Sequence, residues 1–236
     1  MLALGTGIPE TNSASRRVYA LDFWGFGDSS KPDDALESPY ILASYVEMVR
    51  EFMDNMGINI APVAGHSLGG TVALLFALAY PERTEKVIIV GSPIVGSSLN
   101  PFLKLAGYGW IARLVWGIPI IRSAIMRLLL SGDSRQIQQM IYRDVERSCR
   151  ESFFRSIGDL RDTDLRKQLT NLSVPTLGIY GKRDNIVSPS NAEFLIADAQ
   201  RAEVTIMQRS RHFPMTDEPE LFMDVMTGFL NQNGRH

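Results

Sequence analysis

The chain has 236 residues, 45% of them hydrophobic and 21% charged, which is the composition of one sizeable globular domain that can bury a core. Its 24 lysines and arginines and its 26 aspartates and glutamates give a formal net charge of −2. We find no basic stripe, and this charge pattern argues against nucleic-acid binding, which needs a concentrated positive surface.

Cys149 is the only cysteine, so the chain can form no internal disulfide and offers no spaced Cys and His ligands for zinc. Together with the lack of a secretory signal in "MLALGTGIPETNSASRR", this favours a cytoplasmic protein. The run from Ile58 to Pro81 carries no charge and is long enough to span a bilayer, but its glycines and polar residues predict a strand, a turn and a helix. We therefore expect no association with a membrane.

Strand-like and helix-like runs alternate along the chain as far as Ser92. In order, the pattern predicts a strand over Arg17 to Asp22, the loop "FWGFGDSSKPDD", a helix over Tyr40 to Gly57, a strand over Ile58 to Gly65, a helix over Gly69 to Glu82 and a strand over Lys86 to Ser92. Strands that alternate with helices predict an α/β fold, with a mostly parallel sheet flanked by helices.

The alternation stops between Pro93 and Asn171, where the composition becomes helical. Beyond this segment, the pattern predicts a strand over Val174 to Gly181, a helix over Ser190 to Ala199, a strand over Ala202 to Gln208 and a last helix from Glu218. We therefore expect a core built from residues 1–92 and 172–236, with residues 93–171 inserted as a helical cap.

The stretch "GHSLG", residues 65–69, places Ser67 between glycines. It matches G-x-S-x-G, the nucleophile elbow, in which a strand turns abruptly into a helix and exposes the serine hydroxyl at the top of the sheet. A glycine-rich structural corner is the alternative interpretation. The buried strand predicted before the motif and the helix predicted after it favour Ser67 as a nucleophile.

A serine at neutral pH needs a base, and the chain has three histidines. His66 is adjacent to Ser67, where a tight turn directs neighbouring side chains apart, and His236 is the last residue. His212 follows the last predicted strand, at the sheet edge where α/β active sites collect, although it could also be an ordinary surface residue. Elimination favours His212 as the base.

Asp184 follows the strand that ends at Gly181, so it should lie at the same edge and could orient the histidine. Its alternative role is to cap a turn. Three other acids belong to a charged helical stretch that we expect to face solvent: Asp159, Asp162 and Asp164. The chain order Ser67, Asp184, His212 is the order found in α/β-hydrolases.

Four motifs in this order resemble the α/β-hydrolase-fold family and together cover nearly the whole chain: "ALDFWGFGDSSKP", "GHSLGG", "GKRDNIVSP" and "RHFPMTDEPELF". The resemblance implies acyl transfer by a Ser-Asp-His triad, no metal or organic cofactor, and a helical cap inserted after the strand that follows the elbow. The backbone N–H of Leu68 is the expected oxyanion donor next to the nucleophile.

The sequence departs from the family pattern at its start. In the family, three strands precede the one predicted at Arg17 to Asp22, and a loop usually marked by His-Gly supplies a second oxyanion donor. Here only "LALGTG", with Gly5 to Gly7, imitates that loop, and too few residues follow it for the crossover to a parallel strand. We therefore expect Met1 to Arg16 to be the tail of a helix and loop, and the fold to be shortened at its N-terminus.

The favoured function is a serine hydrolase that acts on an ester-like substrate. The cap is expected to cover the pocket as a lid, which suggests a small apolar or aromatic acyl substrate contacted by His66, Trp110 and Trp116. C–C bond hydrolysis or acyl transfer on the same fold is one alternative, and a truncated, non-catalytic remnant is another.

Overall fold

The computed structural model describes residues 2–4, 17–31, 39–106, 108 and 135–232. In the described residues, one six-stranded sheet has the order β2-β1-β3-β4-β5-β6. Its strands are β1 (Leu2–Leu4), β2 (Tyr19–Leu21), β3 (Ala61–His66), β4 (Thr84–Val90), β5 (Thr176–Gly181) and β6 (Ala202–Met207). The strands from β3 to β6 pair in parallel, which confirms the predicted α/β fold with a mostly parallel sheet.

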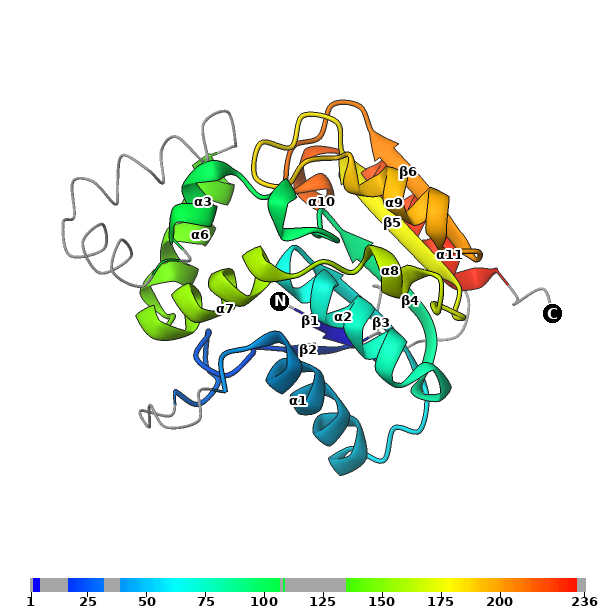
Figure 1. The fold of residues 1–236 in the computed structure, drawn as a ribbon, viewed down its shortest axis with the longest axis horizontal. Coiled ribbons are helices and arrows are strands. Elements are labelled where there is room, and N and C mark those ends of the chain that lie inside the picture. The colour runs from blue at the N-terminus through cyan, green and yellow to red at the C-terminus, as the bar shows by residue number, and fades with distance from the viewer. Residues whose placement is uncertain (1, 5–16, 32–38, 107, 109–134, 233–236) are drawn as a thin grey trace.

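Helices cover both faces of this sheet (Figure 1). The helices α1 (Leu42–Asn55), α2 (Leu68–Ala79) and α9 (Asn191–Asp198) contribute to the larger apolar core, whereas α11 (Pro219–Asn231) packs on the opposite face. β4 contributes to both cores because its side chains alternate: Val87 and Ile89 belong to the first, and Ile88 and Val90 to the second. The apolar second half of this strand, "VIIV", thus reflects burial on both sides.

The strand β1 corrects the expectation for the first sixteen residues. Leu2–Leu4 pair antiparallel with both β2 and β3, so they are not the tail of a helix and loop. Our prediction considered only a parallel neighbour, which needs a long crossover, whereas an antiparallel strand does not. β1 therefore lies between β2 and β3 in the sheet.

The direction of β1 separates its carboxyl end from the nucleophile motif. Leu2 is paired with Gly65, close to the elbow, whereas Leu4 is paired with Val63. The carboxyl end of β1 therefore points to the edge of the sheet away from Ser67. The glycines proposed to imitate the oxyanion loop, Gly5 to Gly7, lie outside the described residues.

Between β4 and β5 the described residues form helices: α3 (Pro101–Ala106), α6 (Arg135–Glu146), α7 (Arg150–Asp162) and α8 (Arg166–Leu169). Figure 1 shows α3, α6 and α7 gathered at one end of the molecule. Buried polar contacts attach α7 to the core, since Ser156 contacts the Tyr45 hydroxyl at 2.8 Å and the Ser152 hydroxyl donates to the carbonyl of Gly25. A separate cap over residues 93–171 remains a prediction.

Within the ranges that the structure covers, no helix is long and apolar enough to cross a bilayer.

Candidate active site

Ser67 occupies the turn between β3 and α2 in an unusual backbone conformation. Its φ of 53° and ψ of −121° lie where side chains are rarely tolerated, and it is the only described residue other than glycine with a positive φ. The Ser67 N–H donates to the carbonyl of Val90 at the end of β4, which anchors the turn to the next strand. Backbone strain of this kind costs on the order of 1–3 kcal/mol and is concentrated at functional sites.

Two glycines around Ser67 allow the strand and the helix to approach closely. A Cβ atom added at Gly65 would lie 2.1 Å from the carbonyl oxygen of Gly69, and one at Gly70 would lie 1.8 Å from the hydroxyl of Ser92. Real Cβ atoms do not approach other atoms this closely, so a side chain at either position would push the strand away from the helix. Gly65 and Gly70 are therefore required by packing at the elbow.

Asp184 and His212 meet at the same edge of the sheet. The Nδ1–H of His212 donates to Oδ2 of Asp184 over 2.7 Å, and both side chains are almost fully buried. The other carboxylate oxygen of Asp184 accepts the backbone N–H groups of Ile186 and Val187 at 2.8 and 2.9 Å. These bonds fix the carboxylate, which in turn fixes the orientation of the imidazole.

His66 contacts the backbone of His212. Its Nε2 lies 2.7 Å from the carbonyl oxygen of His212, and the two imidazole centroids are 4.6 Å apart. Burial, with a further contribution from the nearby His212, holds the pKa of His66 well below its usual value of 6.5. His66 is therefore neutral at physiological pH, and its Nε2 carries the proton, because a carbonyl can only accept.

Two carboxylates organise the loop that carries His212. Asp217, at the end of α10 (Pro214–Asp217), accepts the backbone N–H of Arg211 at 2.7 Å. The buried carboxylate of Glu218 accepts the N–H of Arg209 at 3.0 Å and the hydroxyl of Ser210 at 2.6 Å. These residues precede and follow His212 along the chain, so the loop is closed around the histidine.

We expect Glu218→Gln to lower stability at neutral pH and to change its dependence on acid. The Ser210 hydroxyl, followed by the Arg209 N–H and guanidinium, lowers the pKa of Glu218 from its usual 4.5. Because the folded-state pKa is depressed, the stabilisation is present above about pH 4.5 and is lost as pH falls through the folded-state value. The loss at pH 7 should be about 1.5–3 kcal/mol, the range for hydrogen bonds to a charged group.

Urea unfolding of both proteins between pH 3 and pH 7 measures this difference. The free energies of unfolding should converge toward the acid end, where Glu218 is protonated and resembles glutamine. Two parallel curves would contradict a stabilising role for the Glu218 charge.

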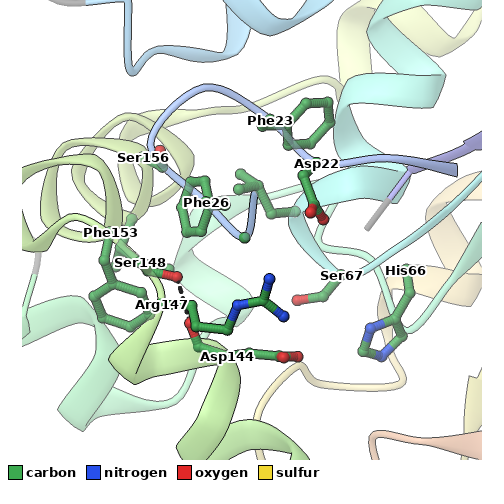
Figure 2. A pocket seen from close by; sticks show the side chains of 13 residues that line it. Asp22, Phe23, Phe26, His66, Ser67, Asp144, Arg147, Ser148, Phe153 and Ser156 are labelled. Carbon is green, nitrogen blue, oxygen red and sulfur yellow. Dashed lines mark hydrogen bonds between the residues drawn. The ribbon is translucent and has the colours of Figure 1, made fainter. Parts of the chain in front are cut away.

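A cavity of about 380 Å³ opens in front of Ser67 (Figure 2). The elbow contributes one wall through His66, Ser67 and Leu68. The other residues that line it come from the loop after β2 and from the region of α6 and α7: Asp22, Phe23, Phe26, Gly27, Asp144, Arg147, Ser148, Phe153, Ser156 and Ile157. The lining thus combines aromatic side chains with the charged side chains of Asp22, Asp144 and Arg147.

The predicted site residues that the structure describes gather around the elbow. The carbonyl of Val90 accepts the N–H of Ser67, and the next residue, Gly91, lies close to His212. A Cβ atom built on Gly91 would be 3.3 Å from Nδ1 of His212. In the described residues no hydrogen bond joins the hydroxyl of Ser67 to His212. Trp110 and Trp116, the predicted substrate contacts in the cap, lie outside the described residues.

Several cavity residues escaped sequence analysis. Asp144 and Arg147 are polar positions near the end of an amphipathic helix, where charged residues normally face solvent. Phe23 and Phe26 belong to the loop "FWGFGDSS", which we used only as a family motif. Its aromatic residues, directly after a predicted strand, were the one available signal.

The sheet order, the serine at a tight strand-to-helix turn and the buried Asp-His pair define an α/β-hydrolase. The chain belongs to the family described as "Serine aminopeptidase, S33", whose model matches residues 10–219. The family resemblance predicted from the four sequence motifs is thereby confirmed.

Named relatives of the chain are hydrolases. It is 27% identical over 236 residues to pimeloyl-[acyl-carrier protein] methyl ester esterase of Aeromonas hydrophila, with 97% of this chain and 90% of the relative covered. It is 28% identical to 2-hydroxymuconate semialdehyde hydrolase of Pseudomonas putida, with coverages of 93% and 78%. A solved hydrolase from Pseudomonas aeruginosa PA01 superposes with a TM-score of 0.74 at 26% identity, covering 91% of this chain and 78% of that structure.

Proposed function

We propose that the chain is a serine hydrolase that cleaves ester-like substrates through an acyl-enzyme on Ser67. The observation that carries this proposal is the conformation of Ser67. It is the only described non-glycine residue with a positive φ, and it lines the cavity. Its neighbour His66 contacts His212 of the buried Asp184–His212 pair. Strain retained at a cavity wall is typical of a functional side chain rather than of a structural corner.

In this mechanism Asp184 sets the tautomer of His212. Because the carboxylate accepts the Nδ1–H, neutral His212 has its free electron pair on Nε2. That nitrogen takes the proton from the Ser67 hydroxyl as the serine oxygen attacks the carbonyl carbon of the substrate. The hydrogen bond between Ser67 and His212 then forms on substrate binding, since catalytic hydrogen bonds are often long or misaligned in free enzymes.

The attack converts the carbonyl oxygen into an oxyanion. Leu68 is the first residue of α2, so its backbone N–H has no partner within the helix and is available to donate to this oxygen. His212 returns its proton to the leaving alcohol as the ester bond breaks, which leaves the acyl group on Ser67. Water activated by His212 then hydrolyses this acyl-enzyme and restores the serine.

The cavity supports an apolar or aromatic acyl substrate. Phe23, Phe26 and Phe153 present aromatic surface to a volume within the range of small-molecule sites. The relatives named above include an esterase and a hydrolase, which supports hydrolysis as the reaction.

A series of p-nitrophenyl esters tests this proposal. Acetate, hexanoate and phenylacetate esters should all be hydrolysed, with a rapid release of p-nitrophenol equal to the enzyme concentration if deacylation is slow. The phenylacetate ester should have the highest kcat/KM because its ring can pack against the phenylalanines. A folded protein that hydrolyses none of the three esters would overturn the proposal.

A further inference from the structure

We infer that His66 is a positioning residue, whose hydrogen bond to the His212 carbonyl holds the base at the correct distance from the nucleophile. This inference rests on the proposed function, because it assigns His66 a task within the same site. Sequence analysis placed His66 among substrate contacts. The structure gives its donor to a protein carbonyl instead, although the ring still lines the cavity.

Because His66 is covalently bonded to Ser67, its hydrogen bond to His212 connects the nucleophile to the base. His66 is the last residue of β3 and the immediate neighbour of the serine, so the bond links the side chain next to the nucleophile to the backbone of the base. These two residues lie 145 positions apart in the chain (212 − 67). Among the hydrogen bonds of the described residues, this one connects the elbow directly to the histidine loop.

His66 and Asp184 act on different parts of His212. Asp184 bonds to ring nitrogen Nδ1 and therefore controls the orientation and the tautomer of the imidazole. His66 bonds to the main chain and therefore controls where the whole residue lies relative to the elbow. An imidazole with the correct tautomer would still be ineffective if its backbone moved away from Ser67.

Packing around His66 makes the link stiff. Its ring lies 4.6 Å from the ring of His212 and 5.0 Å from the ring of Phe213, measured between centroids. Gly91 also lies near the carbonyl oxygen of His212, since a Cβ built on Gly91 would be 3.4 Å from this oxygen. The carbonyl that accepts the bond is therefore next to both His66 and Gly91.

Three substitutions separate the hydrogen bond from the bulk of the side chain. His66→Phe keeps a planar ring and removes the donor. His66→Gln keeps an N–H at a reach similar to Nε2, whereas the shorter His66→Asn does not reach the carbonyl. We expect His66→Phe and His66→Asn to lower kcat by about 10²-fold, the effect of a misplacement of about 1 Å, and His66→Gln to recover most of the loss.

The measurements are kcat and KM with one p-nitrophenyl ester, thermal melting, and the downfield NMR signal of the His212 Nδ1 proton. The inference predicts that kcat falls while KM, the cooperative melt and the NMR signal are retained, since the Asp184 contact persists. If His66→Phe does not fold, the difference in kcat between His66→Gln and His66→Asn tests the inference.

Wild-type kcat in all three variants, or equal losses in the glutamine and asparagine variants, would overturn the inference. Ser67→Ala distinguishes failure of the positioning role of His66 from failure of the proposed hydrolase function. If Ser67→Ala is inactive while the His66 variants are fully active, only the positioning role fails. If Ser67→Ala keeps its activity, the proposed function fails first.

Discussion

Replacement of Ser67 by alanine is expected to lower kcat by about 10⁶-fold, the loss seen when the nucleophile of a serine protease is removed. Among the described residues, no other side chain combines the turn conformation of Ser67 with a place on the cavity wall. Alanine tolerates positive φ no worse than serine does, so the elbow should be kept. The variant should therefore melt like the wild type and lack esterase activity.

The rate of p-nitrophenyl acetate hydrolysis and a circular-dichroism melt provide the measurement. Ser173→Ala is the matched control, because Ser173 is exposed and lies in the segment before β5, outside the site. If Ser67→Ala retained activity within tenfold of this control, the hydrolysis would not use Ser67.

Replacement of Asp184 by asparagine is expected to lower kcat by about 10⁴-fold, as in the trypsin example. The oxygen of asparagine can still accept from the N–H groups of Ile186 and Val187, which turns its NH₂ group toward His212. The imidazole must then accept at Nδ1 and carry its proton on Nε2, where it cannot take a proton from Ser67. The fold survives, and the base is held in the wrong tautomer.

Asp162→Asn is the matched control for this experiment. The side chain of Asp162 is 67% exposed and pairs with the adjacent Arg161, so its removal should leave kcat within a few-fold of the wild type. Equal losses of kcat in Asp184→Asn and Asp162→Asn would show that Asp184 does not orient the base.

The parallel part of the sheet could be predicted from the sequence because its signals are local. Apolar strands buried on both faces and the "GHSLG" turn produce patterns that need no knowledge of distant residues. β1 was missed because a strand of three residues is too short to show the alternation of apolar and polar residues. Its antiparallel pairing with β2 and β3 also depends on residues that are distant in the sequence.

The surroundings of the site depend on contacts between distant residues. Asp159 was expected to face solvent, yet its Oδ2 accepts the N–H of Leu42 at 2.6 Å and so holds the start of α1. The link from His66 to His212 likewise joins two loops that only the folded sheet brings together. In both cases the sequence identifies the side chain but does not identify its hydrogen-bond partner.

Mapping of a fluorophosphonate adduct measures directly whether Ser67 is the nucleophile. Trypsin should release residues 51–83 as one peptide, because no lysine or arginine lies between Arg50 and Arg83, and Ser67 is its only serine. After labelling of the folded protein, we expect the mass of one adduct on this peptide and none in Ser67→Ala. An adduct on a different peptide, or no adduct on a protein that hydrolyses the esters, would contradict it.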